Sequence, residues 1–219
     1  MIFDNFDRIV FAGDSVTDMG SAQPVGEGLA DNLGRGYVRV IENMLAVWYP
    51  ELKLRITNSG TSGNTSRDLL SRFDRDVIDL KPDWLSICIG INDVWRQFDT
   101  PAILCKQVQL DEYRKNMITM LEKAKSELKL KGIFILSPYY MEPNHDDLMR
   151  KRMDEYVAVC KELAEKYDCI FVDFQKLYED YLQYNHSSFI AWDRVHPNQI
   201  GATLMAKEFL KHCDFDFNR

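Results

Sequence analysis

The chain has 219 residues, of which 46% are hydrophobic and 28% charged, close to the average for globular proteins, and we expect one domain over residues 1–219. A chain of this length can bury a real core without disulfides or a structural metal. The net charge of −7 argues against a nucleic-acid partner, because phosphate binding needs clustered basic residues, and no apolar stretch is long enough to span a membrane.

Five short apolar runs, rich in β-branched and aromatic residues, predict strands. In chain order these runs are Arg8 to Phe11, Leu52 to Thr57, Trp84 to Ile89, Gly132 to Leu136 and Cys169 to Phe174. Most of them are apolar nearly throughout, which is typical of a parallel sheet covered on both faces.

Apolar residues at helical spacing lie between these runs and after the last of them. The clearest stripes run from Tyr37 to Trp48, Tyr113 to Leu128, Met149 to Tyr167 and Ala202 to Cys213. Strands that alternate with helices predict right-handed βαβ crossovers, and hence a three-layer α/β/α sandwich around a five-stranded parallel sheet. The basic triplet Arg150 to Arg152 is most simply a solvated helix face.

The cysteines and the first residues indicate the compartment. The five cysteines include no Cys-x-x-Cys pair, and no basic segment followed by an apolar run opens the sequence. We therefore expect reduced thiols in a cytoplasmic protein. His145 stands beside two aspartates, but no second His or Cys cluster completes a site, so we expect no metal.

Polar residues follow the first three predicted strands, beyond whose carboxyl ends a parallel sheet binds its ligands. The tripeptide Gly13-Asp14-Ser15 follows the first strand, although alone it also suits a helix-capping turn. The loop Asn58 to Thr65 follows the second strand, and its backbone N–H groups could stabilise a developing oxyanion. Asn92 follows the third strand and offers a side-chain amide, but asparagine is also common in turns and N-caps.

A histidine with an acidic partner precedes the last predicted helix. Asp193 stands three residues before His196, a separation that one tight turn can close. Neutral histidine is the usual general base, and a carboxylate orients it and stabilises its charged form. A surface pair or a helix cap would give the same spacing, so these two residues alone leave the role open.

Together the four segments resemble the conserved blocks of the SGNH hydrolases, a superfamily of GDSL-like esterases. Gly13-Asp14-Ser15 matches the first block, Asn58 to Thr65 the second, Gly90 to Asp93 the third and Asp193 to Pro197 the last. The resemblance spans almost the whole chain and implies a flavodoxin-like fold. Val16 is the one small departure, since the family's name-giving motif has leucine there.

The resemblance also implies roles for individual residues. Ser15 is the nucleophile, and Asp193 and His196 complete its catalytic triad. The N–H of Ser15, the N–H of Gly63 and the side chain of Asn92 form the oxyanion hole. No metal or organic cofactor is required.

Within the superfamily the chain looks most like the intracellular acetylxylan esterases. The segments that carry this likeness are Gly34 to Val38, Lys81 to Phe98 and Ala191 to Pro197. The likeness implies removal of O-acetyl groups from xylo-oligosaccharides through an acyl-enzyme on Ser15, with a small acetylated carbohydrate as partner and a homo-oligomer left open. Two alternatives also stay open: a lysophospholipase or thioesterase on the same scaffold, and a catalytically silent carbohydrate-binding protein.

Three aromatic residues are expected to bind the substrate: Trp95, Tyr140 and Trp192. Sugar rings stack their C–H faces on aromatic side chains, so these residues favour a carbohydrate over an alkyl chain. The sequence contains no interfacial helix with a basic face, which also disfavours a lipid. The three side chains could instead pack in the core.

Overall fold

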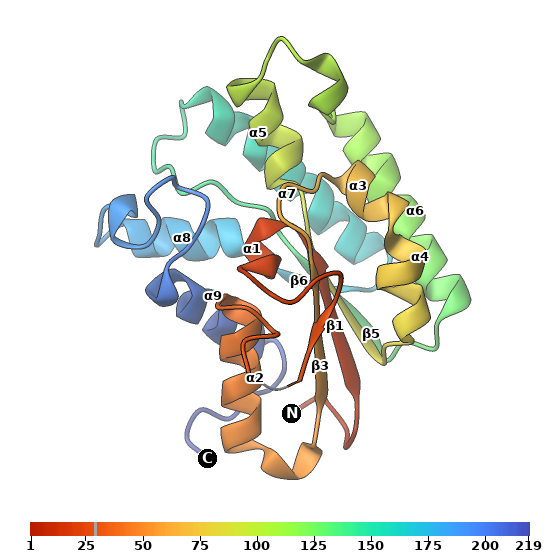
Figure 1. Cartoon of the computed structure of the whole chain (residues 1–219). Helices are drawn as coiled ribbons and strands as arrows, with labels where there is room; N and C mark the ends of the chain where they lie inside the picture. Colours follow the sequence, from red (N-terminus) through yellow and green to blue (C-terminus); the bar gives the residue numbers. More distant parts are fainter. Residues whose placement is uncertain (29) are drawn as a thin grey trace.

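The computed structural model describes residues 1–28 and 30–219, and in them a six-stranded sheet has the order β2-β3-β1-β4-β5-β6 (Figure 1). The strands are β1 (Arg8–Gly13), β2 (Gly26–Glu27), β3 (Arg55–Gly60), β4 (Trp84–Cys88), β5 (Gly132–Leu136) and β6 (Ile170–Val172). Neighbouring strands are parallel, except that β2 pairs antiparallel with β3. The five parallel strands follow one another in the flavodoxin-like order, which confirms the predicted fold class.

The sequence predicts five strands, one fewer than the sheet contains. The extra strand, β2, contains only Gly26 and Glu27, which pair with Asn58 and Thr57 at the edge of the sheet. Two residues are too few to give an apolar pattern, so the sequence contains no signal for this strand. The second predicted strand is also displaced toward the C-terminus, because Pro50–Leu52 form a 3-10 turn before β3 begins.

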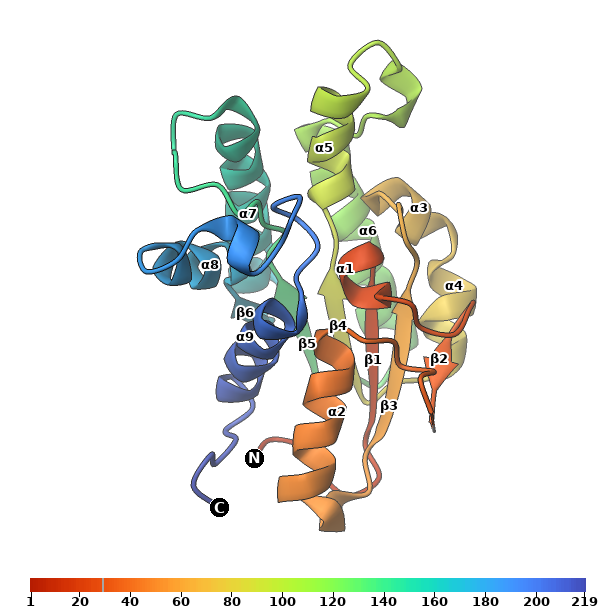
Figure 2. The same ribbon diagram turned by 60° about the vertical axis from the view of Figure 1, so that its left-hand side comes forward.

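Helices cover both faces of the sheet (Figures 1 and 2). They are α1 (Ser15–Asp18), α2 (Tyr37–Trp48), α3 (Ser66–Ser71), α4 (Phe73–Asp76), α5 (Ile91–Asp99), α6 (Leu110–Glu127), α7 (Leu148–Lys166), α8 (Phe174–Leu182) and α9 (Gln199–Lys211). Helices α2 and α9 pack together on one face, and α6 lies between α3 and α7 on the other, which confirms the three layers. Among the described residues, no helix is long and apolar enough to cross a membrane.

The central strands are buried on both faces, which explains why they read as continuous apolar runs. Ile9, Val10, Phe11 and Ala12 of β1 are all 0% exposed. Each fully buried side chain of this size, the alanine apart, stabilises the fold by about 1.5–3 kcal/mol. The core therefore holds β1, and the residues that follow it, in a fixed place.

The basic triplet is a solvated face only in part, because Lys151 is exposed and Arg152 half-buried, whereas Arg150 is buried. The Arg150 side chain is only 2% exposed. Its Nε donates to Asp154 Oδ1 at 2.8 Å, its Nη1 donates to the Glu142 carbonyl at 2.7 Å, and it also pairs with Glu179. Asp154 lies four residues from Arg150 on the same helix, but Glu179 lies 29 residues away, and only the fold brings it to the guanidinium.

Strands β1, β3 and β4 end side by side at one edge of the sheet. Gly13 pairs with Gly60 on one side and with Cys88 on the other. The segments that leave these three strands begin at the same level. They are the segments in which the sequence places Ser15, Gly63 and Asn92.

Candidate active site

Ser15 opens the short helix α1 immediately after β1. A Cβ atom on Gly13 would lie 2.3 Å from Thr17 Oγ1, so the sharp turn into α1 requires glycine. Asp14 caps the helix, its Oδ1 accepting from the Val16 N–H at 3.0 Å. Burial raises the pKa of Asp14 to about 7. The structure thus gives Asp14 a role in shaping the turn that presents the Ser15 hydroxyl.

The hydroxyl of Ser15 meets a histidine and an aspartate in one hydrogen-bonded chain. Ser15 Oγ lies 2.7 Å from His196 Nε2, and His196 Nδ1 lies 2.6 Å from Asp193 Oδ2. Asp193 Oδ1 also accepts the N–H groups of Val195 at 3.0 Å and of His196 at 2.8 Å. The carboxylate therefore holds both the imidazole ring and the turn that carries it.

Asp193 stays ionised because of these bonds. Burial favours its neutral form, but the hydrogen bonds from His196 and Val195 outweigh burial and hold the pKa of Asp193 below its usual value. An ionised carboxylate beside Nδ1 favours a proton on that nitrogen, which leaves Nε2 as an acceptor facing Ser15. This arrangement can accept the Ser15 proton during nucleophilic attack on a carbonyl.

Two glycines, Gly60 at the end of β3 and Gly63 in the loop that follows, have different environments. A Cβ atom on Gly60 would lie 2.3 Å from the backbone nitrogen of Asp18, so Gly60 lets α1 pack against the end of β3. Gly63 is exposed, has a left-handed φ of +82°, and would place a Cβ atom in open space. Of the two, Gly63 is the one that a bound ligand can approach.

Asn92 is buried in the first turn of α5, where two bonds fix its side chain. Its Nδ2 donates to the Asn64 carbonyl at 3.0 Å, and its Oδ1 accepts from Arg96 Nη2 at 3.0 Å. Because guanidinium only donates, the second bond determines which end of the amide is oxygen. Among the described residues Asn64 is the one acceptor of this amide, so a second N–H remains for a ligand.

Two of the three predicted aromatic residues lie next to His196. The Trp95 ring centroid is 6.0 Å from that of the His196 imidazole. Trp192 is 86% exposed. It lines a hollow of about 310 Å³, whose lining residues are Met19, Ser188, Ala191, Trp192, His196, Pro197 and Asn198.

Tyr140 is placed differently. Its side chain is half-buried, and its backbone N–H donates to Gln175 Oε1 at 2.8 Å. A hydrogen bond with the Tyr140 side chain raises the pKa of Arg194. Tyr140 thus contacts the loop that carries His196, and it does not line the hollow beside Trp192.

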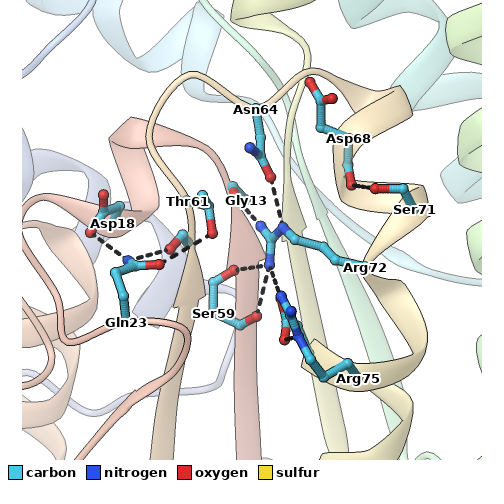
Figure 3. Close-up of polar contacts among 12 residues, drawn as sticks. Gly13, Asp18, Gln23, Ser59, Thr61, Asn64, Asp68, Ser71, Arg72 and Arg75 are labelled. Carbon is cyan, nitrogen blue, oxygen red and sulfur yellow. Dashed lines mark hydrogen bonds and ion pairs between the residues drawn. The ribbon is translucent and has the colours of Figure 1, made fainter.

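Two arginines in the surroundings of the site make contacts that the sequence did not predict. Arg96 stands four residues after Asn92, and on a helix this spacing puts both side chains on one face, so the contact could have been anticipated. Arg72 bonds to Gly13, Ser59 and Asn64, residues far from it in sequence, and nothing in the pattern around it indicates these contacts (Figure 3).

Comparison with known proteins agrees with this geometry. The chain matches the model of the GDSL-like Lipase/Acylhydrolase family over residues 11–204. It is 45% identical over 213 residues to an acetylxylan esterase of Geobacillus stearothermophilus, covering 97% of this chain and 96% of that protein.

Solved structures give the same result. The crystal structure of an acetylxylan esterase from Geobacillus stearothermophilus has a TM-score of 0.97 and 44% identity, covering 100% of this chain and 99% of that one. An enzyme described as an alpha/beta hydrolase, from the metagenome of Lake Arreo, Spain, has a TM-score of 0.93 and 42% identity over 97% of each chain. The resemblance inferred from four short motifs is thereby confirmed: the chain belongs to the GDSL-like lipase/acylhydrolase family and is a serine esterase.

Proposed function

We propose that the protein removes O-acetyl groups from xylo-oligosaccharides through an acyl-enzyme on Ser15. The observation that carries this proposal is the hydrogen-bonded chain from Ser15 through His196 to Asp193, with contacts of 2.7 and 2.6 Å. A relative of 43% identity and TM-score 0.97 is described as an acetyl-xylooligosaccharide esterase, which supports the substrate. Variants of that relative in which a serine, a histidine or an aspartate is replaced by alanine are described as catalytic mutants.

The first half of the reaction forms the acyl-enzyme. His196 Nε2 accepts the Ser15 proton while Ser15 Oγ attacks the acetyl carbonyl, and Asp193 stabilises the imidazolium that results. The N–H of Ser15, the N–H of Gly63 and the Asn92 amide bind the oxyanion of the tetrahedral intermediate. Its collapse breaks the bond to the sugar oxygen, which takes the proton from His196 and leaves as an alcohol.

The second half releases acetate. Water gives a proton to His196 Nε2 and attacks the acetyl carbonyl on Ser15, forming a second tetrahedral intermediate in the same oxyanion hole. This intermediate expels Ser15 Oγ, which regains its proton from His196. The cycle consumes one ester and one water and produces one sugar hydroxyl and one acetic acid.

The surroundings of His196 favour a sugar over a lipid as the leaving group. Trp192 offers a large exposed ring beside the hollow of about 310 Å³, and Trp95 lies on the α5 side of the imidazole. Flat aromatic surface next to polar groups suits a pyranose ring. The volume of this hollow lies at the lower end of the range for ligand pockets, about 300–1,000 Å³.

Two experiments test this function. Ser15→Ala should remain folded and lose several orders of magnitude in kcat, since only oxyanion binding and substrate positioning would be left. Near-normal turnover by a folded Ser15→Ala variant would refute the nucleophile. The substrate is tested with acetylated xylo-oligosaccharides, read by mass loss, alongside p-nitrophenyl esters of increasing chain length. Higher kcat/KM for octanoyl than for acetyl esters would replace the acetylesterase with a lysophospholipase or thioesterase.

The compartment is part of the same proposal. All five cysteines are free thiols, and three of them, Cys88, Cys160 and Cys213, are buried. A reducing compartment such as the cytoplasm maintains thiols in this state. Cell fractionation followed by the esterase assay tests this, and activity found mainly in the medium would contradict it.

A further inference from the structure

Arg72 joins helix α3 to helix α4 and extends its guanidinium toward the ends of β1 and β3 (Figure 3). Its side chain is only 9% exposed. Nη2 donates to the Gly13 carbonyl at 2.9 Å, and Nη1 donates to the Ser59 carbonyl at 3.0 Å. Nε donates to Asn64 Oδ1 at 2.7 Å. One planar group thus connects the strand that leads to Ser15, its neighbour in the sheet, and the loop that follows Gly63.

Asn64 is hydrogen-bonded to both Arg72 and Asn92. The side-chain oxygen of Asn64 accepts from Arg72, while its backbone carbonyl accepts from Asn92 Nδ2 at 3.0 Å. Asn64, the residue that follows Gly63, is therefore held between the guanidinium and the Asn92 amide. A shift of Arg72 would move both the Gly63 segment and the direction of the amide.

The opposite flank of the loop is held separately. Asp18 Oδ2 accepts from the N–H of Ser62 at 3.2 Å, and Gln23 Nε2 donates to the Gly60 carbonyl at 3.0 Å. Gln23 Nε2 also donates to Asp18 Oδ1 at 3.2 Å (Figure 3). These bonds fix the loop up to Ser62. Asn64 is held by Arg72 and Asn92 through its side chain and its carbonyl, and its N–H donates to the Thr61 carbonyl at 3.2 Å.

A lysine could not reproduce these contacts. Guanidinium donates in fixed directions within one plane, whereas an ammonium is a point charge on a flexible stem. Stability alone is a weak reason for this arginine, because a buried pair such as Arg72 with Asp76, at 3.0 Å, yields little net free energy after desolvation.

We propose that Arg72 is a positioning residue of the oxyanion hole, which sets where Asn64, the residue that follows Gly63, and the Asn92 amide stand relative to Ser15. The inference rests on the proposed function, since that function assigns these groups to the oxyanion. Arg72 itself touches no reacting atom. Its effect should therefore appear in kcat, which depends on transition-state contacts, and not in KM.

The test compares Arg72→Lys and Arg72→Met with the control Arg75→Met. Arg75 also pairs with Asp76, but its side chain is 66% exposed. With p-nitrophenyl acetate, both Arg72 variants should lose roughly 10- to 100-fold in kcat, since misplacing an oxyanion donor costs up to what its removal costs. KM should stay within about two-fold for every variant, and Arg75→Met should keep the parent kcat. Melting temperature and circular dichroism report the folded fraction.

A second variant keeps the test decisive if an Arg72 variant fails to fold. Asn64→Ala removes the acceptor and leaves Arg72 in place. It should lower kcat, and combining it with Arg72→Lys should add little, because both changes break the same connection. The proposal is overturned if the folded Arg72 variants match Arg75→Met, if Asn64→Ala keeps the parent kcat, or if the losses lie in KM. An inactive Ser15→Ala with unchanged Arg72 variants would retain the proposed function and remove only the role of Arg72.

Discussion

Replacing Asp193 by asparagine should exchange the donor and the acceptor in the hydrogen bond with His196 Nδ1. The backbone contacts of Asp193 show why. Two backbone N–H groups, those of Val195 and His196, donate to Asp193 Oδ1 at 3.0 and 2.8 Å. In Asp193→Asn the amide oxygen must stay at that position to accept them, so the amide NH₂ takes the place of Oδ2. An amide nitrogen only donates, hence His196 Nδ1 must become the acceptor and the ring proton must move to Nε2.

The consequence for catalysis can be estimated. With its proton on Nε2, His196 can no longer accept the proton of Ser15, 2.7 Å away. A wrong tautomer of this kind costs about 10⁴-fold in kcat, or roughly 5.5 kcal/mol of transition-state stabilisation. Folding should change little, because both backbone bonds survive. Asp193→Ala leaves the same two N–H groups without their acceptor and should also destabilise the fold, by about 1–3 kcal/mol for each group that stays buried.

The assay is hydrolysis of p-nitrophenyl acetate between pH 6 and 9, with melting temperature measured in parallel. The pKa of Asp193 lies below its usual value, so its carboxylate stays ionised over this range and its titration should leave no step in the parent profile. The reasoning fails if a folded Asp193→Asn variant keeps kcat within about ten-fold of the parent, since the wrong tautomer should lower kcat by about 10⁴-fold.

Three further outcomes follow from the site. Asn92→Ala should lower kcat by about 100-fold or more, as the loss of one oxyanion donor does, and an effect confined to KM would show that Asn92 only positions substrate. Gly60→Ala should lower the melting temperature more than Gly63→Ala, since its Cβ would lie 2.3 Å from backbone whereas alanine at Gly63 adds only the strain of a left-handed φ, and Gly63→Ala should have the larger effect on kcat; the reverse pattern would exchange the roles of the two glycines. Burial raises the pKa of Asp93 from 3.8 to about 7, so its contribution to stability is full below about pH 4 and is lost as the pH rises through 7. Asp93→Asn should flatten the dependence of melting temperature on pH over that interval, and an unchanged slope would count against this assignment.

The sequence predicts those parts of the fold whose signal is local. The run from Arg8 to Phe11 is buried on both faces, and α2 begins and ends where the stripe from Tyr37 to Trp48 predicts. The contact between Asp193 and His196 is equally local, because one turn closes it. Elements of this kind depend on residues within a few positions of each other, and periodicity or spacing reveals them.

What the sequence does not predict depends on tertiary contacts. Arg72 and Arg75 stand three residues apart, yet one is enclosed by strand ends and the other is mostly in solvent. The buried Arg150 gave a wrong prediction for the same reason. From sequence alone, a charged residue is predicted to be exposed to solvent. Only the folded chain places near it the hydrogen-bond acceptors that offset the free-energy cost of burying its charge.

The bond between Ser15 and His196 joins residues that are 181 positions apart. During translation, the serine therefore leaves the ribosome long before its proposed general base has been synthesised. A chain that ends before residue 196 lacks this histidine and should hydrolyse nothing, because turnover requires the connection after α8 to bring His196 to Ser15. Esterase activity in a refolding experiment should accordingly report when this contact forms, and spectroscopic signals from the sheet should report when the strands form.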